Sequence, residues 1–183
     1  APGGKTAHIL ELADVDLTAL EIDPLRAVRI TENLDRLGLK ANVRVADASD
    51  IQSWWDGKPF DRILLDAPCT ASGIVRRHPD IPWSRKPEDI AQLARTQAKL
   101  LENLWPLLVK GGRILYAVCS VFSEEGPAQI ESFCSKHPDA KLIPIGPDKE
   151  ILLSLPPAEG VQDKPEFFPK THDGFFYALI EKI

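Results

Sequence analysis

The sequence contains no methionine, only three cysteines and no run of about 18 apolar residues. A membrane-spanning helix needs roughly 20 predominantly apolar residues, so no membrane span is expected. The first residues do not join a basic segment to an apolar one, which argues against a signal peptide. Three cysteines without metal-ligand spacing favour a reducing, cytoplasmic setting and predict no metal site. The missing methionine, a start methionine included, suggests a fragment of a longer chain.

The size and the net charge of the chain narrow the class of protein further. The chain has 183 residues, of which 44% are hydrophobic, and a formal net charge of −5. This size and composition predict one domain over residues 1–183 with its own core, and we expect it to act as a monomer. A free-standing nucleic-acid binder is usually basic, so the acidic balance argues against tight, unaided binding of RNA or DNA. A nucleic-acid substrate held partly by something else remains compatible with it.

Strand and helix patterns alternate along the chain. Ser123, as a cap followed by two glutamates, marks the start of one helix, and Gly38 lies just past the end of another. Alternating strands and helices with apolar strand cores predict an α/β doubly wound sheet. Strand patterns lie at residues 17–21, 43–46, 61–66, 111–119 and 174–182, helical patterns at 7–13, 24–37, 87–108 and 123–136, and a loop rich in proline, glycine and charge at 145–172.

Acidic or reactive side chains end four of the predicted strands. They are Glu21, Asp47, Asp66 and Cys119. Ligands of doubly wound sheets bind at the carboxyl ends of the strands. Acids that served solubility alone would be scattered over helix faces instead, so the four strand ends point to a binding site.

The opening stretch APGGKT has two interpretations. It is compatible with the end of a phosphate-binding P-loop or with the glycine turn of a methyltransferase that binds S-adenosylmethionine. A P-loop needs another glycine five residues before its last one, and that position would lie ahead of Ala1. The stretch by itself therefore leaves both interpretations open.

The carboxylates at the strand ends help to distinguish a P-loop from a methyltransferase turn. If a strand precedes Ala1, Gly3 and Gly4 form a turn that lets the backbone approach a ligand closely. Glu21 would then accept hydrogen bonds from ribose hydroxyls, a spacing that fits dinucleotides and S-adenosylmethionine alike. Asp47 could meet an adenine amino group. A P-loop enzyme would need neither and would use Asp66 for magnesium. A solvated acid at Glu21 and an ordinary surface lysine at Lys5 are the non-functional alternatives.

Two thiols follow strands that we expect to be neighbours. The stretch LLDAPCTASG (64–73) places Asp66 and Cys69 at one strand end, and Cys119 ends the next central strand. Neighbouring strands lie about 5 Å apart, so both thiols can face one pocket. For each cysteine alone, a buried small apolar side chain is the usual role, and Cys134 keeps that interpretation.

Such a pair suits methyl transfer to a pyrimidine. A thiolate is a strong nucleophile and can add to carbon 6 of the ring, which makes carbon 5 nucleophilic enough to accept a methyl group from a sulfonium. Asp66 is placed to stabilise the charge that develops near ring nitrogen 3. A second group must then help remove the proton at carbon 5 and release the enzyme.

The stretch RRHPDIPWSRK (76–86) is a cationic patch in an acidic chain. Cations beside an aromatic ring suit single-stranded RNA, through phosphate pairing and base stacking. The alternative is a solvated loop with Trp83 packed inward. Because the patch directly follows the Asp-Ala-Pro-Cys element, we favour contact with a substrate whose target base has left its stack. The residues assigned to this contact are Arg76, Arg77, His78 and Trp83.

The quoted stretches APGGKT, DRILLDAPCTASG, RRHPDIPW and GGRILYAVCS together resemble the RNA cytosine-5 methyltransferases, in particular the bacterial 16S ribosomal RNA enzymes of the Sun (Fmu) type. The similarity runs from Ala1 to about Glu131 and resumes at DGFFYALI. It implies a class I S-adenosylmethionine-dependent methyltransferase fold, Rossmann-like and mostly parallel, with an antiparallel C-terminal strand. The residues it implies for S-adenosylmethionine are Ala1, Pro2, Gly3, Gly4, Lys5, Glu21, Asp47 and Asp66.

The resemblance also implies roles for the thiols. In the RNA enzymes the second cysteine, here Cys119, attacks the base, and the Pro-Cys cysteine, here Cys69, assists product release. DNA cytosine methyltransferases use the Pro-Cys thiol as the nucleophile, so spacing alone does not assign the roles. The chain departs from the family at Val118, where a threonine usually precedes the nucleophile.

Sequence that the family carries before APGGKT is also absent, namely the rest of the first strand and an N-terminal RNA-binding region. Since RNA affinity comes largely from cationic contacts to phosphate, we expect the chain to bind RNA poorly by itself. The expected substrate is RNA, and 16S ribosomal RNA by resemblance. A P-loop nucleotide hydrolase, a non-catalytic cofactor- or RNA-binding domain and a DNA methyltransferase are the alternatives.

Overall fold

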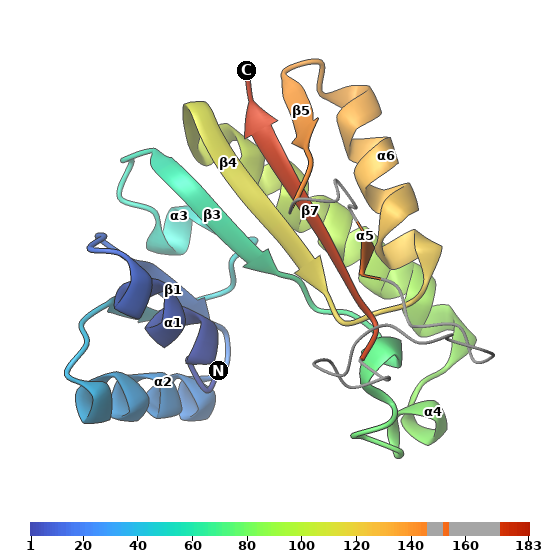
Figure 1. Ribbon diagram of the computed structural model, residues 1–183, viewed down its shortest axis with the longest axis horizontal. Helices are drawn as coiled ribbons and strands as arrows, with labels where there is room; N and C mark the ends of the chain where they lie inside the picture. Colours follow the sequence, from blue (N-terminus) through green and yellow to red (C-terminus); the bar gives the residue numbers. More distant parts are fainter. Residues whose placement is uncertain (146–151, 154–172) are drawn as a thin grey trace, which may run out of the picture. The chain divides into compact units, whose positions relative to one another are not determined.

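The computed structural model describes residues 1–145, 152–153 and 173–183. They fall into two units, Ala1–Lys58 and Pro59–Ile183, each with its own strands and helices (Figure 1). Most of the loop predicted at 145–172 lies outside the described residues, but Leu152–Leu153 within it form a short strand, β6, that the sequence did not predict. In the described ranges no helix is both long and apolar enough to cross a membrane.

The first unit is built on a parallel pair of strands. Strand β1 (Thr18–Glu21) pairs with β2 (Asn42–Val45), in a register that joins Thr18 to Asn42 and Glu21 to Val45. The helices are α1 (Gly4–Leu12), α2 (Pro24–Leu37) and the short α3 (Ile51–Trp54). The predicted strands and α2 are confirmed within about a residue, α1 begins earlier than predicted, and α3 was not predicted.

Local chemistry explains the bounds of α2. The Asp23 side chain caps its first turn, where the Leu25 backbone N–H donates to Oδ1 at 2.8 Å. Gly38 ends the helix with a φ of 68°, a left-handed conformation that favours glycine. The core of this unit forms where α2 meets α1 and β2; its residues are Ala7, Leu10, Ile30, Leu34, Leu39, Ala41 and Val43.

The second unit is built on a mixed sheet in the order β3-β4-β7-β5, with β6 also pairing β7. Strand β3 (Phe60–Asp66) is parallel to β4 (Leu108–Val118), whereas β7 (Phe175–Lys182) is antiparallel to β4 and to β5 (Ala140–Ile143). The predicted α/β sheet, mostly parallel with an antiparallel C-terminal strand, is confirmed. The sequence did not predict β5.

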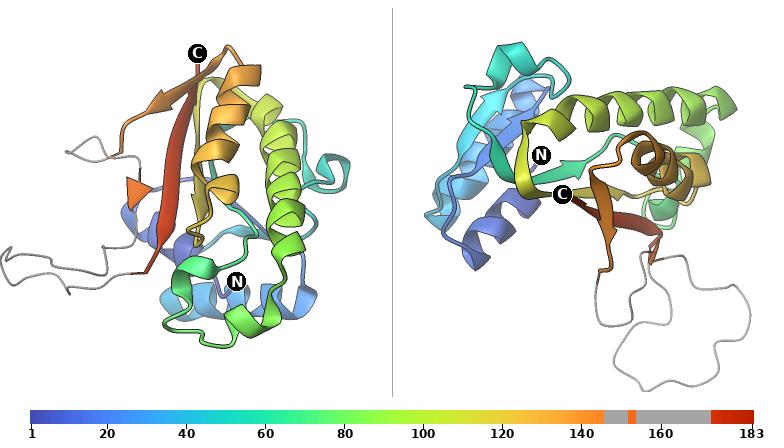
Figure 2. Two further views of the ribbon diagram at one scale, coloured as in Figure 1. Left: turned by 90° about the vertical axis from the view of Figure 1, so that its right-hand side faces the viewer. Right: turned by 90° about the horizontal axis from the view of Figure 1, so that it is seen from above.

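Two helices of this unit, α5 (Pro87–Leu104) and α6 (Pro127–Lys136), lie side by side on one face of the sheet (Figure 2). The helix predicted over 87–108 ends at Leu104, and Trp105–Leu107 form the 3-10 helix η2 around Pro106, which has no N–H to donate. The helix α4 (Ile81–Ser84) and the 3-10 helix η1 (Ser72–Ile74) were not predicted.

The helix predicted over 123–136 is interrupted. It splits into the 3-10 helix η3 (Ser123–Glu125) and α6, with Gly126 between them at φ −122° and ψ −106°. A residue before proline is disfavoured in the helical region, and Gly126 precedes Pro127. The Ser123 side chain therefore does not cap a continuous helix, contrary to the prediction.

Candidate active site

The carboxyl ends of β3 and β4 lie at the same edge of the sheet (Figure 1). Their parallel pairing runs to Asp66 opposite Ala117, and the Ala67 N–H then donates to the Ala117 carbonyl at 3.0 Å. The segments that follow leave the sheet together, and they bring Cys69 Sγ to 3.5 Å from Cys119 Sγ. The two thiols therefore meet at this edge, as the spacing of neighbouring strands predicts.

The pKa of the Cys69 thiol depends on its neighbour. The adjacent Cys119 sulfur, joined by a hydrogen bond, raises the pKa of the Cys69 thiol, and burial raises this pKa further. Cys69 therefore keeps its proton and can donate it in the hydrogen bond to Cys119. Since the thiolate is the nucleophilic form of cysteine, this arrangement favours Cys119 as the attacking sulfur and Cys69 as a proton donor beside it.

Gly73 joins both thiol-bearing segments to the start of the C-terminal strand. Its N–H donates to the Cys119 carbonyl at 3.0 Å, and its own carbonyl accepts from the Gly174 N–H at 2.8 Å. A Cβ atom on Gly73 would lie 1.9 Å from the Gly174 oxygen. Only glycine fits so close to another backbone. The sequence contains this glycine in TASG, but no local pattern indicated its role.

A buried carboxylate, which sequence reasoning missed, lies behind the thiols. Glu125 is 0% exposed, and its carboxylate accepts hydrogen bonds from the neighbours of both cysteines, Thr70 and Ser120. In the sequence, Glu125 lies in the first turn of a predicted helix, where a negative charge is favourable. That position gave no other indication of a role. Nothing in the local sequence signals that Glu125 is enclosed.

Asp66 is the last residue of β3, at the edge of the sheet from which the Cys69 segment departs. The residue is exposed at this edge of the sheet. It belongs to the same unit as the two thiols.

The arginines of the cationic patch are engaged within the chain. Arg77 Nε lies 2.6 Å from Asp173 Oδ2, and Arg76 Nη2 lies 3.5 Å from Asp173 Oδ1. Asp173 is buried, whereas both arginine side chains stay more than half exposed. Arg85 Nε donates to the Thr70 carbonyl at 3.1 Å, which ties the patch to the Cys69 segment. The arginines thus have a structural role that the sequence did not predict.

The aromatic residue of the patch faces solvent. Trp83 lies on α4 with 91% of its surface exposed, so the alternative in which it packs inward is wrong. His78 is exposed as well. An exposed tryptophan in a segment that also holds three arginines is suited to stacking on an unpaired base.

The first unit carries the residues expected to hold the cofactor. Gly3 directly precedes α1 with a φ of 98°, and a Cβ there would lie 3.1 Å from Ile30 Cγ2. The segment is held by Asn33, whose Nδ2 donates to the Pro2 carbonyl at 3.0 Å. This glycine turn leads into a helix N-terminus, and Ala1, Gly4 and Lys5 are exposed around it.

The two carboxylates of this unit lie at one edge of its strand pair, because β1 and β2 are parallel neighbours. Glu21 ends β1, is 9% exposed, and accepts a hydrogen bond from the Asp23 N–H at 3.2 Å. Asp47, just past β2, is exposed and accepts from the Ser49 N–H at 2.8 Å. A glycine turn with two carboxylates fits the hydroxyl and amino groups of an adenosine cofactor.

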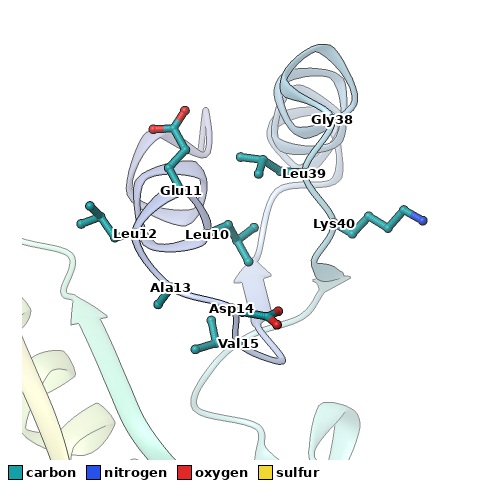
Figure 3. A pocket seen from close by; sticks show the side chains of 9 residues that line it. All are labelled: Leu10, Glu11, Leu12, Ala13, Asp14, Val15, Gly38, Leu39 and Lys40. Carbon is teal, nitrogen blue, oxygen red and sulfur yellow. The ribbon is translucent and has the colours of Figure 1, made fainter.

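A hollow of about 460 Å³ in the first unit lies away from these carboxylates. It is lined by Leu10–Val15, which span the last turn of α1 and the residues just past it, and by Gly38–Lys40, which follow α2 (Figure 3). Both segments precede a strand, so the hollow lies at the amino ends of β1 and β2. Glu21 and Asp47 lie at the carboxyl ends, where ligands of such sheets bind.

Comparison with known proteins gives consistent matches. The family model described as 16S rRNA methyltransferase RsmB/F matches residues 1–181. The ribosomal RNA small subunit methyltransferase B of Salmonella arizonae is 49% identical over the whole chain, which spans 40% of that relative's length. The solved structure of NSun6 from Pyrococcus horikoshii with SFG is 30% identical, with a TM-score of 0.77, and the chain covers 46% of it. A methyltransferase homologue from the same organism is also 30% identical, with a TM-score of 0.76 and 59% coverage.

These matches confirm the fold as that of the class I S-adenosylmethionine-dependent methyltransferases, and S-adenosylmethionine as the cofactor of the family. They give no support to the P-loop alternative. The similarity inferred from the motifs is confirmed over the whole chain. The chain belongs to the 16S rRNA methyltransferase RsmB/F family.

Proposed function

We propose that the chain is the catalytic domain of an S-adenosylmethionine-dependent RNA cytosine-5 methyltransferase that acts on 16S ribosomal RNA in the cytoplasm. The observation that carries the proposal is the 3.5 Å separation of the Cys69 and Cys119 sulfurs in a member of this family. The chain spans 40% of the length of its Salmonella arizonae relative, so the activity is proposed for the whole protein, acting as a monomer.

The cofactor is assigned to the residues that follow the strands. Gly3 and Gly4 would form the turn against it, Glu21 would accept the ribose hydroxyls, and Asp47 would accept the adenine amino group. Ala1, Pro2, Lys5 and Asp66 complete the set implied by the motifs. When bound, S-adenosylmethionine supplies an electrophilic methyl group on a sulfonium.

The thiols are assigned to the base. The Cys119 thiolate adds to carbon 6 of cytosine, so a carbon–sulfur bond forms and electron density moves to carbon 5. Asp66 near ring nitrogen 3 stabilises the charge that develops. After carbon 5 has gained its methyl group it loses its proton to a base, the double bond between carbons 5 and 6 returns, and the bond to sulfur breaks. Cys69 beside Cys119 assists this release.

RNA is assigned to the patch around Trp83. The target base would leave its stack to reach the thiols, and Trp83 would stack on an unpaired neighbour. Arg76, Arg77 and His78 would line the path of the backbone. Because the net charge is −5, we propose that strong RNA binding needs sequence outside residues 1–183.

Two alternatives make different predictions. In a DNA-type mechanism Cys69 would attack the base, but its raised pKa disfavours that role. A non-catalytic cofactor-binding domain would have no use for two adjoining thiols at a strand edge. Neither alternative is favoured by a specific observation.

The test uses the full-length protein and RNA that carries 5-fluorocytosine at candidate sites. Fluorine cannot leave as a proton, so a methylated base stays attached to the attacking sulfur. Wild type, Cys119→Ala and Cys69→Ala are compared for a covalent protein–RNA band that depends on S-adenosylmethionine. We expect the band to disappear only in Cys119→Ala.

Loss of the band only in Cys69→Ala would reverse the roles of the thiols. If none of the proteins forms a covalent band with any of the RNA sites tested, the proposed methyl transfer is contradicted. A Cys134→Ser variant serves as the matched control, because Cys134 lies on α6 and not in the segments after β3 and β4.

A further inference from the structure

Glu125 contacts the segments of both thiols. Its Oε1 atom accepts the Thr70 N–H at 2.9 Å, and its Oε2 atom accepts the Thr70 and Ser120 hydroxyls, each at 2.5 Å. Thr70 directly follows Cys69, and Ser120 directly follows Cys119. One enclosed carboxylate therefore bridges the residues that follow the two cysteines.

Gln97 extends the same contact to the other side of Cys69. From α5, its Nε2 group donates to Glu125 Oε1 at 3.1 Å and to the Pro68 carbonyl at 2.9 Å. Pro68 and Thr70, the two chain neighbours of Cys69, are thus both tied to one polar cluster. Gln97 is 0% exposed, so these bonds are shielded from water.

Glu125 is itself held in place. The Tyr116 hydroxyl, in the middle of the sheet, donates to the Glu125 carbonyl at 2.6 Å. Burial is the main cause of the raised pKa of Tyr116, so the hydroxyl stays protonated and remains a donor. These hydrogen bonds to Glu125 lie inside the protein, where a hydrogen bond is electrostatically stronger than in water.

We propose that Glu125 is a positioning residue of the reaction: it fixes the relative position of the Cys69 and Cys119 thiols by holding the two segments that carry them. The inference rests on the proposed function. Its contacts are to the neighbours of the thiols, so Glu125 acts through them and is not a catalytic residue.

Four groups donate hydrogen bonds to the Glu125 carboxylate, and their chemistry predicts which substitution of Glu125 disturbs the thiol segments more. Oε1 faces only N–H donors, from Thr70 and Gln97, whereas Oε2 faces two hydroxyls that can accept as well as donate. In Glu125→Gln the amide nitrogen can replace Oε2 while the amide oxygen keeps the N–H donors. Glu125→Ala leaves those donors enclosed without an acceptor, so both thiol segments lose their common attachment.

The test compares four full-length proteins: wild type, Glu125→Gln, Glu125→Ala and a control, Phe133→Leu. All four carry Cys134→Ser. Phe133 packs edge-on against Trp105 at 5.3 Å, near the amino end of β4, whereas Glu125 follows its carboxyl end. Four quantities are measured: the Kd of S-adenosylmethionine, kcat, the KM for RNA, and the rate of formation of the 5-fluorocytosine adduct. A fifth is the rate at which diamide joins Cys69 to Cys119, taking up the two thiol hydrogens.

We expect Glu125→Ala to lower kcat and the adduct rate by about 100-fold, as misplacing a reacting group by about 1 Å does. The Kd of the cofactor and the KM for RNA should stay within about threefold, and diamide coupling should slow. Glu125→Gln should recover part of each rate, and Phe133→Leu should leave all of them near wild type.

Wild-type adduct and coupling rates in Glu125→Ala would overturn the proposal. So would an equal loss in Phe133→Leu, or a loss of cofactor binding in step with kcat, since either would indicate general unfolding. Diamide coupling does not depend on methyl transfer. If wild type forms no adduct but coupling slows in Glu125→Ala, the proposed function fails while the positioning role stands.

Discussion

Cys69 Sγ and Cys119 Sγ lie 3.5 Å apart, just past the ends of two parallel strands that are separated by the helices α4 and α5 and by more than forty residues of sequence. The hydrogen bond between them raises the pKa of Cys69. This raised pKa is the basis of the first two predictions.

Cys69 should react with iodoacetamide more slowly than Cys119 between pH 7 and 9, because less of it is thiolate. The rates are measured by mass spectrometry of the two peptides. In Cys119→Ala the neighbouring sulfur is gone, so Cys69 should become more reactive. Faster alkylation of Cys69 than of Cys119 in wild type would contradict the assigned proton positions.

The same pKa predicts a change of stability with pH. The pKa of Cys69 is raised above the ordinary thiol value of 9.0, so above pH 9 the unfolded chain loses this proton while the folded chain keeps it. The stabilising contribution is complete below pH 9 and is lost as the pH rises. Denaturant unfolding at pH 8, 9 and 10 should show a fall of at most about 1.4 kcal/mol per pH unit from this group. Cys69→Ala should show a shallower fall.

Gly73→Ala should destabilise the protein, because the added Cβ would lie 1.9 Å from the Gly174 oxygen. Overpacking of this kind costs about 1–3 kcal/mol. The measurement is the free energy of unfolding in urea. The matched substitution is Gly4→Ala, where a Cβ would meet nothing within 4 Å; its stability should match wild type or exceed it.

Glu21→Gln should weaken S-adenosylmethionine binding, because it removes the charge from a carboxylate assigned to the ribose hydroxyls. Hydrogen bonds to charged groups contribute about 1.5–3 kcal/mol, so calorimetric titration should show a Kd roughly 10- to 150-fold higher. Asp14→Asn is the control, since Asp14 lines the hollow at the opposite ends of the strands. An unchanged Kd in Glu21→Gln would remove Glu21 from the cofactor site.

Trp83→Ala should lower RNA affinity and leave cofactor affinity unchanged, because Trp83 is 91% exposed beside the cationic segment. Loss of one base–aromatic stack costs about 1–3 kcal/mol, a factor of roughly 5 to 150 in Kd. Filter binding of the full-length protein to single-stranded RNA measures this change. Leu12→Ala, which changes a residue 75% exposed in the first unit, should have no effect; equal affinities in both variants would exclude Trp83 from the RNA site.

The order of elements and the meeting of the thiols could be predicted from the sequence. Apolar runs define β1, β3 and β4, and Pro24 and Gly38 define the ends of α2, because these signals act within a few residues. Parallel neighbouring strands end at one edge, so residues just past them come together. Short elements such as α3 and β5 lack a strong periodic pattern, and the Gly126-Pro127 break overrode an otherwise helical stretch.

Only the tertiary structure decided what lies around the thiols. Glu125 is enclosed by residues from four different elements or segments, the Arg77–Asp173 pair joins positions ninety-six residues apart, and Gly73 is constrained by Gly174. Each of these contacts depends on where distant segments meet. A carboxylate in a first helical turn and an arginine in a loop look the same in sequence whether they face water or a buried partner. The sequence by itself therefore determined which reactive groups reach the edge of the sheet, and the packing of distant segments decided how they are held there.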